Sequence, residues 1–184
     1  MSEAIKKVVE VELSGVPPLL RAVFNLISTA GAEHYALFGG AVRDADYAAQ
    51  HNAPRDIKDY DLRVWISPEQ ENNFVRNLGK TVRHVPSDGT GRIRYCLDYC
   101  GAELDISVRP IPEIYKDKNI PPEAVARDRA ADSDVGLCSI AIDPHSRAWG
   151  TLEYLSDRDK KTLTIYPLAD IERKDAYSKR MGKK

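Results

Sequence analysis

The sequence predicts an α+β fold, or a mixed α/β one, in which a central mixed sheet is flanked by helices. Segments with helical spacing of apolar residues alternate with short apolar runs in the first half of the chain. Two strand-like segments then follow each other directly at 92–98 and 103–108, which is typical of adjacent strands. The length of 184 residues fits a single domain, 1–184, with a core of its own.

Helix and strand signals alternate in the first half. Two prolines at 17–18 open a segment with helical apolar spacing, which we expect to end near Gly31. Residues 35–38 form a short apolar run typical of a strand. They lead into two glycines at 39–40, and residues 41–50 then have the character of a helix.

A strand, a helix and a pair of strands are expected next. Residues 59–66 alternate between two faces and predict a strand. Pro68 begins a polar helix that we expect to run to Leu78. A short turn separates the strands at 92–98 and 103–108. In the strand at 59–66, Leu62, Val64 and Ile66 share one face, and Asp61, Arg63 and Trp65 share the other.

The last third of the chain has weaker signals. Proline-containing loops at 110–112 and 121–122 flank what reads as a polar connection. Residues 135–142 indicate an apolar strand or a short buried element, and residues 162–166 indicate a last strand. We expect a polar helix from about residue 168 to complete the domain.

Composition and charge are those of an ordinary globular protein. Hydrophobic residues make up 42% and charged residues 30% of the chain, and the formal net charge is −1. No apolar run approaches the roughly 18–20 residues of a membrane span, and the start is too charged for a signal peptide. We therefore expect a cytoplasmic protein with no membrane partner. Residues 173–184 form a basic C-terminal tail, which suits either contact with a phosphate backbone or a solvated terminus.

The cysteine, histidine and serine residues favour neither a zinc site nor a hydrolase triad. The three cysteines are an odd number without a CxxC pair, which indicates a reduced compartment. The four histidines share no metal-ligand spacing, and no serine lies in a GxSxG turn. These cysteines are Cys96, Cys100 and Cys138, and the histidines are His34, His51, His84 and His145.

Gly39 and Gly40 stand where a strand should turn into a helix. Without side chains, glycines let the backbone approach a bulky anion closely. The helix that follows offers unpaired N–H groups and the positive end of its dipole. The pair therefore suits a triphosphate, although a Gly-Gly turn before a helix is more often only a turn.

Asp59 and Asp61 are two positions apart on a predicted strand, so both side chains point to the same face. Adjacent carboxylates repel each other unless a cation lies between them. Mg²⁺ takes oxygen ligands and commonly binds one or two carboxylates together with substrate phosphates. Because apolar neighbours mark a core strand, the pair favours a two-metal phosphoryl-transfer site over a solvated strand face.

Asp105 supplies a third carboxylate. It alternates with the apolar residues Leu104 and Ile106, so it leaves the predicted sheet on the face opposite the core. Beside the strand of Asp59, it would complete the cluster and could serve as the base for an attacking hydroxyl. Glu103, on the same face, is the second choice for this role.

Four motifs follow one another in the chain: FGGAVRD at 38–44, RDIKDYDLRV at 55–64, ELDIS at 103–107 and SDVGLCSIAID at 133–143. Together they resemble the head domain of the tRNA CCA-adding enzyme and bacterial poly(A) polymerase family. This family belongs to the polymerase-beta-type nucleotidyltransferases and pairs a GGxVRD loop with a DxD metal pair on the following strand. The resemblance implies a nucleotidyltransferase-like fold, two Mg²⁺ ions and a nucleoside triphosphate, with RNA or tRNA as a candidate partner.

The resemblance also implies roles for individual residues. In the glycine loop, Gly39, Gly40 and Arg43 would contact the triphosphate, and Asp44 would support that loop. The metal ligands would be Asp59 and Asp61, and the strand alternation described above adds Asp105 to them. In the later motif, Asp134 matches an aspartate in a segment that helps to hold the sugar and phosphates of the nucleotide.

Three departures from the family pattern matter for the function. The loop between Arg43 and Asp59 is longer than the resemblance leads us to expect. The family's RRDFTINA segment has lost its paired arginines here, and Cys138 replaces the asparagine; Arg127 and Arg129 lie just upstream as candidate substitutes. The family's helical domains, which select the base and hold tRNA, are not matched, so CCA templating is not expected.

The sequence thus predicts a magnesium-dependent nucleotidyltransferase that moves a nucleoside monophosphate from an NTP to an acceptor hydroxyl. An RNA 3′ end is one acceptor, and a small molecule or a protein hydroxyl is another. A catalytically impaired nucleotide- or RNA-binding module of the same fold is the alternative, and one subunit of a two-protein system is a third hypothesis. The sequence gives no indication of the oligomeric state.

Overall fold

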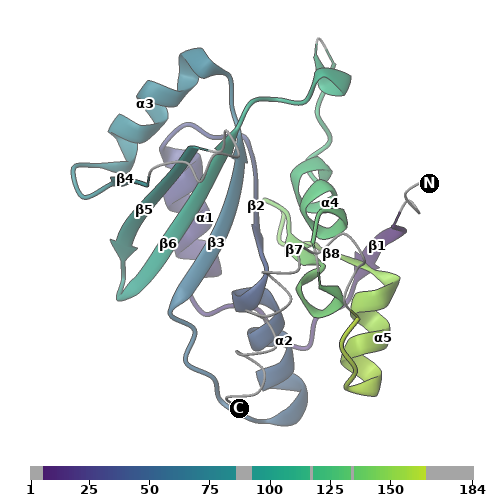
Figure 1. The fold of residues 1–184 in the computed structure, drawn as a ribbon. Coiled ribbons are helices and arrows are strands. Elements are labelled where there is room, and N and C mark those ends of the chain that lie inside the picture. The colour runs from purple at the N-terminus through teal and green to yellow at the C-terminus, as the bar shows by residue number, and fades with distance from the viewer. Residues whose placement is uncertain (1–5, 86–92, 117, 134, 165–184) are drawn as a thin grey trace.

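A mixed sheet of eight strands forms the centre of the molecule (Figure 1). The computed structural model describes residues 6–85, 93–116, 118–133 and 135–164. Within these ranges the strand order is β1-β8-β7-β2-β3-β6-β5-β4. The strands are β1 (Val8–Val11), β2 (His34–Phe38), β3 (Asp59–Trp65), β4 (Arg83–Val85), β5 (Ile93–Tyr99), β6 (Ala102–Arg109), β7 (Ile140–Ile142) and β8 (Ala148–Thr151).

Helices cover both faces of this sheet (Figure 1). This confirms the predicted fold class, a mixed sheet flanked by helices. The described α-helices are α1 (Leu20–Thr29), α2 (Gly40–His51), α3 (Pro68–Leu78), α4 (Ala124–Ala131) and α5 (Leu152–Lys160), with short 3₁₀ helices η1 (Glu113–Tyr115) and η2 (Gly136–Cys138).

The larger core lies on the face that α1, α2 and α3 cover. Side chains alternate along β3 and β6, and every second one enters this core, where it is shielded from water. Helix α1 contributes one apolar stripe, which is why its sequence spacing predicted it correctly. The residues of β3 and β6 in this core are Tyr60, Leu62, Val64, Leu104, Ile106 and Val108.

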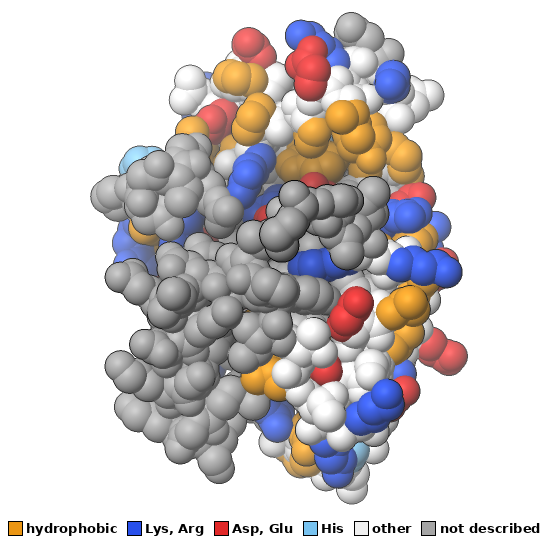
Figure 2. All heavy atoms as spheres, turned by 45° about the vertical axis from the view of Figure 1, so that its right-hand side comes forward, with side chains coloured by type: hydrophobic (Ala, Val, Ile, Leu, Met, Phe, Trp, Pro, Cys, Tyr) orange, Lys and Arg blue, Asp and Glu red, His pale blue; other side chains and the backbone are white. Residues whose placement is uncertain are grey.

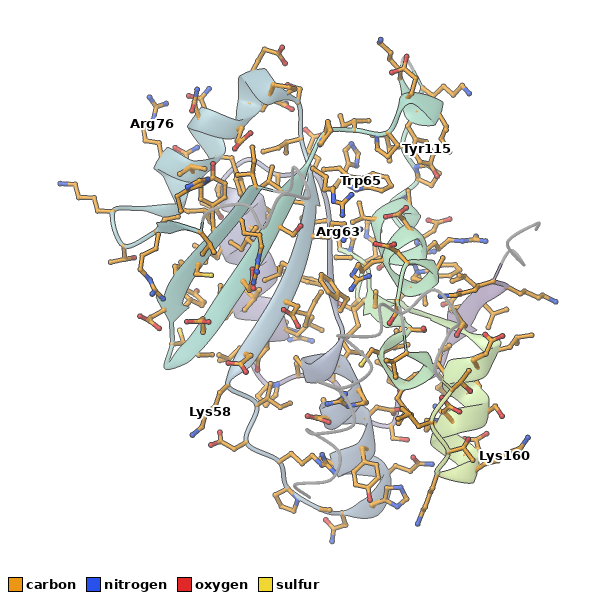
Figure 3. The ribbon with its side chains drawn as sticks, viewed as in Figure 1. Lys58, Arg63, Trp65, Arg76, Tyr115 and Lys160 are labelled. Carbon is orange, nitrogen blue, oxygen red and sulfur yellow. The ribbon has the colours of Figure 1, made fainter. Side chains whose placement is uncertain are left out.

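The opposite face of the sheet carries a smaller core and a polar area. Helix α4 packs Ala124, Val125 and Ala126 against this face, together with Trp65 and Trp149. Figure 3 shows Trp65 and Lys58 at opposite ends of β3. The contacts of α4 are mainly with β2, β7 and β8, so the start of β3 and its neighbours β6 and β5 keep polar side chains on this face.

Several expected elements differ in the structure. The polar connection between the two proline-containing loops contains η1, the helix α4 that follows it was not predicted, and residues 135–142 divide into η2 and β7. Residues 162–164 do not form a strand, while 165–166, the helix expected from 168 and the basic tail lie outside the described residues. Strands β1, β4 and β8 and helix α5 were not predicted. In the described part, no helix has the length and apolar character needed to cross a membrane.

Candidate active site

The parallel pairing of β3 with β6 brings the predicted carboxylates together. Asp61 lies opposite Asp105, and Asp59 lies opposite Glu103. Residues opposite each other in a ladder share a face. All four acids therefore lie on the same face as α4, in the part of it that α4 does not cover. Sequence spacing alone predicted the shared face of Asp59 and Asp61, and the strand order now adds Asp105.

Asp61 is the most perturbed acid of this group. Its pKa is raised from 3.8 to about 6, first by burial and then by the charge of Asp105. The charge of Asp59 acts in the same direction, whereas Arg129 and Arg94 lower the pKa. A half-buried carboxylate between two other acids is poorly stabilised as an anion, and a divalent cation would supply the missing charge.

Asp105 already has a cationic partner. Arg94 of β5 donates from Nε to Oδ1 of Asp105 at 3.1 Å and from Nη2 to Oδ2. Glu103 has its own partner, because Arg83 of β4 donates to its Oε2 at 3.2 Å. The strand arginine Arg94 therefore pairs with Asp105, the third carboxylate of the predicted site.

The glycine loop lies directly against Asp61. Gly39 has a φ of +74°, a conformation that side-chain-bearing residues rarely adopt, and a Cβ built there would be 3.4 Å from Oδ2 of Asp61. Its N–H donates to the carbonyl of Ile140, which fixes the turn from β2 into α2. No side chain caps the start of α2. The first N–H groups of this 12-residue helix thus open beside the carboxylates, as an anion site requires.

Asp44 supports the loop through two arginines. It accepts a hydrogen bond from Nε of Arg43 at 2.8 Å and one from Nη1 of Arg55 at 3.3 Å. The guanidinium of Arg55 also lies 4.4 Å from the ring centroid of Tyr47. The long segment before β3 is therefore fastened to α2 at Asp44, the residue expected to support the loop.

Arg43 also connects the loop to the segment that departs from the family pattern. Its Nη1 donates to Sγ of Cys138 at 3.4 Å. Burial raises the pKa of the Cys138 thiol, although Arg43 opposes the shift. Cys138 thus holds Arg43 as a neutral acceptor. Asp134 lies outside the described residues.

The glycine loop, Asp59 and Asp61 line one hollow of about 1190 Å³, whereas Asp105 and Glu103 are not among its lining residues. That volume is ample for a nucleoside triphosphate, since pockets for small ligands are commonly about 300–1,000 Å³. Its walls combine the glycine loop with acids and bases from β3, β5, α2, α4 and α5. In the space-filling view, Lys and Arg side chains lie across the middle of the face, below a gathering of hydrophobic side chains (Figure 2). The lining includes Gly39, Gly40, Arg43, Asp59, Asp61, Arg94 and Arg129.

Arg129 is a site residue that the sequence alone did not distinguish from Arg127. It comes from α4, lines the hollow and stacks 4.2 Å from the centroid of Phe38. Among nearby cations it does most to lower the pKa of Asp61. Arg127, the other upstream arginine, lies over Trp149 beside a separate hollow of about 340 Å³. The sequence gave no reason to prefer one arginine, because it did not predict α4, the helix that directs the two side chains to different hollows.

The acids fit a magnesium ion in part. Asp59 and Asp61 provide two adjacent carboxylates at the hollow, the oxygen ligands that Mg²⁺ prefers beside substrate phosphates. Within the described ranges, no three His, Cys, Asp or Glu residues are already arranged to hold a metal ion. Both oxygens of Asp105, the third candidate ligand, face the guanidinium of Arg94.

A solved structure shares this fold. The crystal structure of the Bacillus stearothermophilus CCA-adding enzyme in complex with CTP matches with a TM-score of 0.52 and 17% sequence identity. The match covers 87% of this chain and 37% of that enzyme, so the chain spans little more than a third of its length. No protein family model matches the sequence, and neither does any curated protein. At this identity the comparison establishes the fold alone: the chain has a nucleotidyltransferase-like fold.

Proposed function

We propose that this chain is a magnesium-dependent nucleotidyltransferase that moves a nucleoside monophosphate from an NTP to an acceptor hydroxyl. One observation carries the proposal: parallel strands put Asp61 beside Asp105, and Asp61 lies against the glycine loop and lines one hollow with it. Carboxylates and phosphate-binding N–H groups converging on one cavity suit phosphoryl transfer. The solved neighbour binds CTP, which agrees with a nucleotide substrate.

The residues divide the task. The start of α2 at Gly39 and Gly40 would bind the β and γ phosphates, with Arg43 adding positive charge. Asp59 and Asp61 would hold magnesium, which supplies charge neutralisation for the triphosphate and the leaving pyrophosphate. Asp105 would accept the proton of the attacking hydroxyl once its carboxylate is available.

The transfer itself is a substitution at the α-phosphorus. The acceptor oxygen bonds to this phosphorus, and the bond from it to the oxygen bridging the α and β phosphates breaks. Pyrophosphate leaves with the electron pair of that bond. An RNA 3′ end is the acceptor suggested by the resemblance, and small-molecule or protein hydroxyls are the alternatives.

A label-transfer assay tests the proposal. The protein is incubated with magnesium, each α-labelled NTP in turn, and RNA, protein or metabolite extract as acceptor. We expect Asp61→Asn to reduce transfer at least about 100-fold, the order of loss seen when one transition-state contact is removed. Asp98→Asn, at an exposed position of β5, is the matched control and should retain transfer. Equal activity of Asp61→Asn and the parent protein would exclude this mechanism.

A nucleotide-binding module without turnover is the second candidate. The specific observation in its favour is the occupation of both Asp105 oxygens by Arg94. Calorimetric titration of nucleotide with and without magnesium separates the two. Tight binding that is independent of magnesium, without label transfer to any acceptor, would support the module.

A further inference from the structure

Arg94 reaches Asp105 across the face of the sheet. In the antiparallel pairing of β5 with β6, Arg94 lies opposite Ser107, two positions from Asp105 on the same face. The guanidinium makes a two-pronged contact, from Nε to Oδ1 at 3.1 Å and from Nη2 to Oδ2. Both oxygens of the third carboxylate therefore face the arginine.

This contact competes with both roles that Asp105 could have. A guanidinium that binds both oxygens of a carboxylate takes about two of the carboxylate's four lone-pair sites, and its positive charge disfavours a second cation or a proton there. The charge of Arg94 also reaches Asp61 and lowers its pKa, which places the arginine among the acids of the site. The guanidinium thus supplies part of the positive charge that a bound cation would bring to Asp61 and Asp105.

The pair can be opened at moderate cost. The Arg94 side chain is 43% exposed, and that of Asp105 is 20% exposed. Ion pairs open to solvent contribute little to stability in typical measurements. The planar guanidinium fork matches a phosphate as well as a carboxylate. Arg94 lines the same hollow as Gly40 and Arg43, so a bound triphosphate offers it a second partner.

We propose that Arg94 masks Asp105 in the nucleotide-free protein and moves to the triphosphate when nucleotide binds, so that Asp105 becomes available to a divalent cation. This inference rests on the proposed function and adds an order to it: nucleotide first, then the complete metal site. By linkage, nucleotide and cation must each tighten the binding of the other by the same factor.

Manganese binding to the full chain tests the mask without measuring catalysis. Mn²⁺ affinity is determined by electron paramagnetic resonance, with and without a non-hydrolysable NTP analogue. In the absence of nucleotide, we expect Arg94→Gln to bind Mn²⁺ at least about fivefold more tightly than the parent, the lower end of typical coupling between sites. The tightening of Mn²⁺ binding by the analogue should shrink in the same variant.

Removing any positive charge near the acids should raise the affinity of the site for cations, so a charge-matched control is needed. Arg129→Gln also removes a cation that acts on Asp61, and the ion pair that it opens is the one with Asp132, at 3.5 Å. Arg83→Gln opens the neighbouring pair between Arg83 of β4 and Glu103, which lies on the same strand as Asp105. The gain in Arg94→Gln should exceed the gain in either control.

Asp105→Asn identifies the ligand that is released. In the Asp105→Asn background, Arg94→Gln should increase the Mn²⁺ affinity no more than Arg129→Gln does, because the carboxylate that Arg94 masks is gone. An equal gain with and without Asp105, or no gain at all, would overturn the mask. Thermal melts of each variant verify folding, which the exposure of Arg94 favours.

The two proposals fail in different ways. If Mn²⁺ binds the parent, is lost in Asp61→Asn, and is unaffected by Arg94→Gln, the mask is wrong and the metal site stands. If neither the parent nor any variant binds Mn²⁺, with or without nucleotide analogue, the proposed function fails and the mask fails with it.

Discussion

The half-buried Asp61 links the site to the stability of the protein. Folding places its carboxylate near Asp105 and Asp59 and removes much of its hydration, which raises its pKa to about 6. In the unfolded chain the pKa returns to the ordinary value near 3.8. Folding therefore favours the protonated form of Asp61, and the ionised form opposes folding.

The contribution of Asp61 to stability decreases as the pH rises. The stabilisation from protonated Asp61 is complete below about pH 4 and is lost as pH rises to about 6, by up to about 3 kcal/mol. Relative to Asp61→Asn, the parent protein should lose stability over this window. Urea unfolding at pH 4 to 7.5 measures the difference, and other titrating groups largely cancel in it.

Magnesium should reverse this loss. If Asp61 holds the ion, added Mg²⁺ should stabilise the parent above pH 6 and leave Asp61→Asn unchanged. The exposed carboxylate of Asp98 provides the comparison, because Asp98→Asn should follow the parent at every pH. A parent curve parallel to that of Asp61→Asn would contradict the raised pKa.

At the scale of elements, the turn from β2 into α2 decides the shape of the phosphate loop. Gly39 adopts a φ of +74°, whereas Gly40 begins the helix and has only the end of Arg43 near its missing Cβ, at 3.7 Å. The two glycines are adjacent in sequence, yet they meet different constraints. Gly39 allows the positive φ of the turn, and Gly40 keeps the first turn of the helix free of a side chain.

The pair Gly39→Ala and Gly40→Ala tests this division. Gly39→Ala should lower the free energy of unfolding by roughly 1–3 kcal/mol, because the new side chain is strained at positive φ. Gly40→Ala should remain within about 0.5 kcal/mol of the parent, since alanine is tolerated in a helix. Denaturant unfolding provides both values. Equal effects in the two variants would show that the backbone of Gly39 is not restrictive.

Helix α4 shows where element prediction fails. Its sequence, AVARDRAA, buries small alanines and one valine, so no broad apolar stripe marks it. Close packing on β2 and β8 allows this short helix to cover Ala36 and Trp149. The helix also brings Asp128 and Asp132 to the buried Arg63, which lies between β3 and α4 (Figure 3).

At the scale of the whole molecule, Asp46 joins three distant segments. Its carboxylate is almost fully buried and accepts from the N–H of Ser14 and the hydroxyl of Tyr154, both at 2.7 Å. Arg158 adds an ion pair at 3.5 Å. The segment before α1 is thus connected to α2 and α5 through one acid. Burial and this hydrogen bond raise the pKa of Tyr154.

Tyr154→Phe should therefore destabilise the protein by roughly 1–3 kcal/mol, because a buried carboxylate loses one of its partners. The matched control is Tyr47→Phe, which removes a half-buried hydroxyl of α2 and leaves the partners of Asp46 in place. Thermal unfolding of both variants measures the difference. A Tyr154→Phe protein as stable as Tyr47→Phe would show that water replaces the lost hydroxyl.

The sequence by itself determined the elements whose pattern is local. Period-two alternation predicted β3 and β6, apolar helical spacing predicted α1, and Pro68 marked the start of α3. The same alternation placed Asp59 and Asp61 on one face and Asp105 opposite the core. These predictions held because neighbouring side chains along one strand or helix fix them.

The tertiary structure alone decided which strands are neighbours and what each acid meets. Strand order set Asp61 beside Asp105, the packing of α4 brought Arg129 to the site, and β5 delivered Arg94 to Asp105. None of these contacts has a local signal, because each joins residues far apart in the chain. Burial and charge pairing depend on that assembly, and so do the pKa of Asp61 and the proposed role of Arg94.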